Sequence, residues 1–120
     1  MAIHTLTAVA PSRAERVSSA LFLRVASVLT LLHCVGHTIG GVFAVDAPPG
    51  TTERSVIDAM KSKRFDVMGV TRSFWDFFFG YGLTISVSFL MQSLLFWQLA
   101  GLMKIDPGRA RPMVAGFFFA

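Results

Sequence analysis

Apolar residues form two long runs in this chain. Residues 25–45 and 77–103 contain no aspartate, glutamate, lysine or arginine. A helix of about 20 mostly apolar residues is long enough to cross the hydrocarbon core of a bilayer. Each run meets that length and is flanked by charged residues. The pattern therefore predicts an all-α integral membrane bundle that forms a single domain over residues 1–120.

Turn and capping signals divide this domain into segments. Pro48, Pro49 and Gly50 follow the first run, and Ser73 and Asp76 form a capping-box pattern directly before the second. The predicted segments are a polar tail (1–20), a first span (21–45), a connector (46–73), a second span (74–103) and the start of a third span (109–120). Because the last apolar run is much shorter than a span, we expect the chain to stop inside that third helix, as a C-terminally truncated form would. A last helix that is only half inserted is the alternative.

The connector carries the pattern of a short amphipathic helix. Thr51 or Thr52 is suited to cap it, and Val56, Ile57 and Met60 share one face. Such a helix lies in the plane of the membrane interface. An ordinary solvated loop is the alternative.

Composition and charge agree with a membrane protein. Hydrophobic residues make up 53% of the chain and charged residues 15%, whereas soluble proteins carry about 25% charged residues. The net charge of +4 suits contact with the anionic headgroups of a lipid bilayer. No basic stripe is interleaved with aromatic residues, so nucleic acid is not an expected partner. Cys34 is the single cysteine, which leaves no intrachain disulfide. We expect a membrane location.

Small and polar residues recur on one face of the first span. They are Ala26, Thr30, His33, His37, Gly40 and Ala44. Steps of three and four residues keep side chains on one side of a helix, and ionisable residues within a span are usually buried against protein. Gly36 and Gly40 also form a GxxxG motif, which lets helices pack closely in lipid. We therefore expect both histidines to face a helix partner, in this chain or in a homo-oligomer.

The second span carries a similar stripe at four-residue steps. Its members are Asp76, Gly80, Thr84, Ser88 and Gln92. If the two stripes face each other in antiparallel spans, His37 lies level with Gly82 and His33 lies level with Ser86. The predicted polar partners of the histidines are then Thr84, Ser86 and Ser88, with Gly80 as a further packing position.

Three interpretations of the His33–His37 pair are open. The imidazoles are hydrogen-bonded across a helix interface, or they form a polar site for a small molecule such as a quinone or a lipid headgroup, or a proton relay, or they ligate a metal or haem. A catalytic zinc needs three protein ligands, so another helix would have to complete a metal site. We expect no cofactor.

Structural roles account for the other polar residues. Asp76 satisfies backbone N–H groups in the capping box with Ser73. Gln92 bonds a neighbouring helix, and Cys34 is a small core residue. The chain contains no phosphate-binding glycine loop, nucleophile elbow or HExxH motif, so no catalytic residue is predicted.

Two segments resemble a known group of proteins. They are His33-Cys-Val-Gly-His-Thr-Ile-Gly-Gly41 and Met68-Gly-Val-Thr-Arg-Ser-Phe-Trp-Asp-Phe-Phe-Phe-Gly-Tyr-Gly82. Together they are similar to small uncharacterised bacterial integral-membrane proteins of about four helices, over residues 33–103. The resemblance implies a compact four-helix membrane bundle in a bacterial inner membrane, and it implies no activity.

We predict a non-enzymatic membrane protein whose helices build a bundle or an oligomer. The alternative is a membrane-embedded module that binds a small molecule, quinone, haem or metal through His33 and His37, with Asp76 as a further member. A proton-coupled transporter is the third option.

Overall fold

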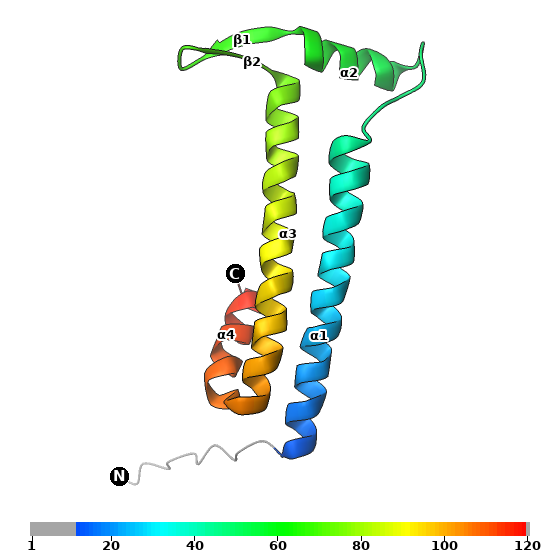
Figure 1. The fold of residues 1–120 in the computed structure, drawn as a ribbon. Coiled ribbons are helices and arrows are strands. Elements are labelled where there is room, and N and C mark those ends of the chain that lie inside the picture. The colour runs from blue at the N-terminus through cyan, green and yellow to red at the C-terminus, as the bar shows by residue number, and fades with distance from the viewer. Residues whose placement is uncertain (1–11, 120) are drawn as a thin grey trace, which may run out of the picture. The chain divides into compact units, whose positions relative to one another are not determined.

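The computed structural model describes residues 12–119, which form four α-helices, a π-helical segment and one β-hairpin (Figure 1). In chain order these are α1 (Arg13–Gly36), the π-helical segment η1 (His37–Phe43), α2 (Thr52–Ser62), β1 (Arg64–Val67), β2 (Val70–Ser73), α3 (Phe74–Ile105) and α4 (Pro107–Phe119). They divide into two compact units. The central unit is Leu29–Ser93, and the terminal unit comprises the described residues of Met1–Val28 and Leu94–Ala120.

Two helical stretches are long and apolar enough to cross a membrane, Arg13–Phe43 and Phe74–Ile105. The core helix of a soluble protein meets the same criteria of length and composition, but most of its residues are buried. Only 17% and 22% of the residues in the most apolar parts of these two stretches are buried. Most of their large apolar side chains therefore lie on the outer surface.

Small residues bring three helices together in the terminal unit. Ala20 of α1, Ala100 of α3 and Ala110 of α4 are completely buried, and alanine allows helix backbones to approach closely. Leu23, Leu99 and Met103 complete this core. The last helix, α4, folds back beside the end of α3 (Figure 1).

The first helix starts earlier than predicted. It begins at Arg13 rather than at Leu21, so the predicted polar tail is partly helical. The reason is a capping box: the Ser12 N–H donates to Glu15 Oε2 at 2.7 Å, and the Glu15 N–H donates to Ser12 Oγ at 3.3 Å. The Ser-x-x-Glu pattern of residues 12–15 is the sequence signal for this start.

The connector contains the predicted short helix. Thr51 caps α2 by accepting a hydrogen bond from the Arg54 N–H at 3.2 Å. Arg54 then forms ion pairs with Asp46 at 2.9 Å and Asp58 at 3.2 Å. Because Ile57 is buried, one face of α2 packs against other residues of the central unit. The alternative of a solvated loop is therefore wrong for these residues.

The prediction of an all-α chain was wrong after α2. Strands β1 and β2 pair in antiparallel register, with Val67 opposite Val70. Met68 and Gly69 join them with φ angles of 52° and 81°. Two consecutive positive φ angles are the signature of a type I′ hairpin turn.

The second long helix starts where the sequence predicted. The Ser73 N–H donates to Asp76 Oδ2 at 2.8 Å, and the Asp76 N–H donates to Ser73 Oγ at 3.2 Å. These reciprocal bonds confirm the capping box. The Phe65 ring lies 4.7 Å from that of Phe74, and Lys61 Nζ lies 4.3 Å from the Trp75 ring. The connector is thereby attached to the first turn of α3.

Candidate functional site

The histidines of α1 and η1 lie beside a row of hydrogen bonds in the central unit. We define the polar seam as the five residues that make these bonds, which are Cys34, His37, Thr38, Gly82 and Ser86. Three of them come from α1 and η1 and two from α3.

Ser86 is the centre of the polar seam. The Thr38 hydroxyl lies 2.8 Å from Ser86 Oγ and 2.7 Å from the Cys34 carbonyl oxygen. The Ser86 hydroxyl donates to the Gly82 carbonyl at 3.1 Å, and the Cys34 thiol donates to the Ser86 carbonyl at 3.2 Å. Cys34 and Ser86 are buried. The Thr38 and Ser86 hydroxyls and the Cys34 thiol are therefore each matched by a hydrogen-bond partner, as burial requires.

His37 joins the polar seam through one of its two ring nitrogens, Nε2. Nε2 lies 3.2 Å from the Gly82 carbonyl oxygen. A carbonyl oxygen only accepts, so Nε2 carries the proton, and in the neutral ring Nδ1 is an acceptor. Nδ1 has no hydrogen-bond partner among residues 12–119. It lies over Gly41, where an added Cβ would come within 3.3 Å of it.

Gly82 allows the two helices to meet. A Cβ added at this glycine would lie 2.8 Å from Val42 Cγ2, closer than real side chains approach. Val42 is 1% exposed. The close approach occurs within η1, where the backbone widens into a π-helix. Such segments are uncommon and occur often at functional sites.

Phe89 packs against both histidine rings. Its ring is 4.6 Å from that of His33 and 5.8 Å from that of His37, and both pairs meet edge to face. His33 is exposed and lines a shallow hollow of about 250 Å³ together with Thr30 and Gln92. The hollow brings one predicted residue of the second span, Gln92, next to a predicted histidine.

The predicted register of the two spans is confirmed for His37. Its hydrogen bond to Gly82 joins the two residues that were expected to lie level. Ser86 contacts Cys34 and Thr38 instead of His33. The predicted depth of the first span relative to the second was therefore correct, but the side chains that meet at this depth differ from those expected.

The predicted stripe of the second span does not form the contact with the first span in the described residues, and its packing against a partner helix stays a prediction. Thr84 and Ser88 are exposed, and their hydroxyls donate to the carbonyls of Gly80 and Thr84 at 2.9 Å. Asp76 is occupied in its capping box. A strict four-residue step drifts about 40° around a helix with each repeat, so the stripe leaves the face that Gly82 and Ser86 occupy.

The predicted packing glycines have no close neighbour within the described chain. Gly36, Gly40 and Gly80 are exposed, and an added Cβ would meet nothing within 4 Å. Packing of these glycines against another helix stays a prediction. On the first span, Ala44 is likewise exposed, whereas Ala26 and Thr30 are half-buried.

Metal ligands do not cluster near the histidines. Among residues 12–119, no group of three histidine, cysteine or acidic side chains is close enough to hold a metal ion. The weak metal prediction for His33 and His37 thus finds no third ligand in the part of the chain that the structure describes.

Sequence reasoning named Gly82 and Ser86 but missed Thr38 and Phe89 as members of the site. On α3 the signal was present as Gly82, Ser86, Phe89 and Ser93, which follow alternating steps of four and three.

No protein family, curated protein or solved structure matches the chain.

Proposed function

We propose that this chain is an integral membrane protein that works as a bundle- or oligomer-forming subunit rather than as an enzyme. One observation carries the proposal: in the central unit, Cys34 and Ser86 are buried where the two long helices meet, while large apolar side chains of the same helices are exposed. Cys34 and Ser86 are buried, whereas Leu32, Ile39 and Met91 are 63%, 60% and 52% exposed. In water this distribution is unfavourable, because burial of apolar surface drives folding. In lipid it is the expected arrangement.

The polar seam supports a packing role for the histidines. His37 is used as a hydrogen-bond donor to a backbone carbonyl, and interhelical polar contacts of this kind stabilise membrane helix pairs by about 0.6–2 kcal/mol each. No catalytic role is needed to explain its position. The seam therefore supports two spans held as a hairpin.

The exposed glycines support an association role. Gly36 and Gly40 present a small-residue surface that the described chain does not cover. In lipid, such a surface favours a second helix, because backbones approach closely across it. A second copy of the chain presents the same surface and is the simplest partner.

Two experiments test this proposal. Alkaline carbonate extraction of membranes should leave the protein in the pellet; release into the supernatant would contradict insertion. Energy transfer between labelled copies in vesicles should fall when Gly36 and Gly40 are both replaced by leucine, and should be unchanged by the control Val35→Leu, which alters an exposed neighbour. Equal transfer in all three proteins would argue against association through this surface.

A binding module that uses the histidines is the second candidate. The observation that favours it is the acceptor Nδ1 of His37, which has no described partner and lies in a π-helical segment. Absorption spectra and metal analysis of purified protein test it. A bound chromophore or metal that is lost in His37→Ala would favour this function, whereas unchanged ligand content in both His33→Ala and His37→Ala would rule it out.

A further inference from the structure

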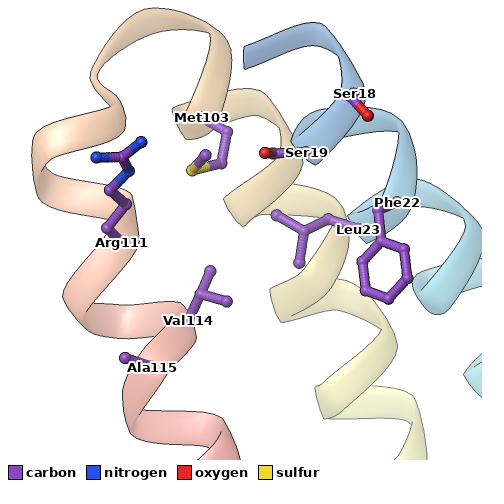
Figure 2. Close-up of a pocket in the computed structure, with 8 residues that line it drawn as sticks. All are labelled: Ser18, Ser19, Phe22, Leu23, Met103, Arg111, Val114 and Ala115. Carbon is purple, nitrogen blue, oxygen red and sulfur yellow. The ribbon is translucent and has the colours of Figure 1, made fainter. Parts of the chain in front are cut away.

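The terminal unit contains a second hollow, with a volume of about 540 Å³. Its walls come from α1, from the end of α3 and from α4 (Figure 2). Sites that hold small ligands have volumes of about 300–1,000 Å³. The size is therefore suited to a headgroup together with the first part of a lipid chain.

The lining changes from polar to apolar along the pocket. On α1, Ser18 and Ser19 precede Phe22, and on α4, Arg111 precedes Val114. Within this unit α1 and α4 both run opposite to α3 and therefore in the same direction (Figure 1). As a result the polar residues of both helices lie at one end of the pocket and the apolar residues at the other. A ligand that matches this gradient is an amphiphile.

The charge at the polar end selects an anion. Arg111 takes part in none of the ion pairs among residues 12–119, whereas its neighbour Arg109 is paired with Asp106 at 3.3 Å. Glu15, on the preceding turn of α1, accepts a hydrogen bond from the Ser12 backbone. Figure 2 shows the Arg111 guanidinium turned toward Met103, with the Ser19 hydroxyl turned to the same side.

Guanidinium and hydroxyl groups without a carboxylate partner form a site for phosphate, because the planar guanidinium matches two phosphate oxygens at once. We propose that this pocket binds one anionic phospholipid, with its phosphate on Arg111 and Ser19 and the start of its acyl chain beside Phe22 and Val114. The inference rests on the proposed function, since two membrane spans place the N-terminal ends of α1 and α4 at headgroup depth.

Lipid retention tests the proposal. Protein reconstituted in phosphatidylcholine nanodiscs that contain a minority of phosphatidylglycerol is transferred to mild detergent, and retained phosphatidylglycerol is counted by native mass spectrometry. Arg111→Gln should lower the affinity for phosphatidylglycerol about tenfold, because one charge-assisted contact is lost. The control Arg109→Gln removes the same charge from a residue already paired with Asp106 and should retain the lipid. Equal retention in both variants, or equal loss, would overturn the proposal.

Two further arms separate a lipid from a free anion. Ala115 is exposed and lines the pocket, so Ala115→Trp fills the apolar end without changing the core and should also abolish retention. Displacement of phosphatidylglycerol by inorganic phosphate, with no effect of Ala115→Trp, would instead assign the site to a free anion and refute the lipid. Carbonate extraction is scored first. A chain that stays in the membrane yet retains no phosphatidylglycerol defeats this inference alone, and a chain that is extracted defeats the proposed function as well.

Discussion

Replacement of Gly82 by alanine tests the packing between η1 and α3. The added Cβ would lie 2.8 Å from Val42 Cγ2 and 3.6 Å from Val42 Cγ1. Val42 is 1% exposed, so its side chain has no open space into which to turn. The helices must therefore separate locally, which also strains the hydrogen bond from His37 to the Gly82 carbonyl.

The expected magnitude follows from two opposing effects. Overpacking of a filled contact costs about 1–3 kcal/mol, and alanine favours a helix interior over glycine by about 1 kcal/mol. Gly80→Ala is the matched control, because it lies one half-turn away in the same helix and has nothing within 4 Å. It receives the helix-propensity gain alone. The free energy of unfolding of Gly82→Ala should therefore lie about 1–3 kcal/mol below that of Gly80→Ala.

Unfolding in mixed micelles, followed by circular dichroism during titration with sodium dodecyl sulfate, measures this difference. A double-mutant cycle with Val42→Ala identifies the cause, because removal of the valine methyls should make Gly82→Ala far less harmful. Coupling of about 1 kcal/mol or more is expected for residues in direct contact. Equal stability of the two alanine variants, or additive effects in the cycle, would refute the packing argument.

Three further predictions use the same unfolding assay. Thr38→Val and Ser86→Ala should each lower the free energy of unfolding by about 1 kcal/mol, and the two changes should show a coupling energy of about 0.6 kcal/mol. The control Ser88→Ala should have little effect, because the Ser88 hydroxyl bonds within its own helix. An equal loss in Ser88→Ala would show that the interhelical bond is not the cause. Ser73→Ala should cost about 1 kcal/mol through loss of the α3 cap, and a stability equal to wild type would contradict the observed capping box. Met68→Gly should raise stability by up to about 1 kcal/mol, because glycine adopts the φ of 52° without strain; a loss of stability would show that the Met68 side chain makes a favourable contact.

The long helices were predictable because their signals are local. Continuous apolar runs define their extent, and the Ser73–Asp76 pair defines where α3 begins. That His37 lies at the same depth as Gly82 was predicted by counting residues along each helix from the connector. This count is valid as long as both helices rise by the same distance per residue.

The polar seam was less predictable because it depends on helix rotation. A pattern of polar residues at four-residue steps looks like one face, yet it winds around the helix. Thr84 and Ser88 were therefore predicted beside Ser86 as partners of the histidines, although their hydroxyls bond within α3. The η1 segment adds a second difficulty, since the π-helix changes the rotation of every residue after Gly36. Nothing in the residues His37–Phe43 predicted that change.

The hairpin was missed because its turn residue is atypical. Type I′ turns favour Asn-Gly or Gly-Gly, and Met68 is a rare choice for a positive φ. Gly69 and the alternation of Phe65 and Val67 were the available signals.

The central claim is that two helices cross the bilayer as a hairpin. The side of the membrane on which each loop lies tests this claim most directly. Single cysteines at Lys63, in the connector, and at Lys104, at the end of α3, would be placed in a Cys34→Ala background and treated in sealed vesicles with a membrane-impermeant maleimide. Two crossing helices predict that the two cysteines are labelled from opposite sides of the membrane. Labelling of both from the same side would contradict the account.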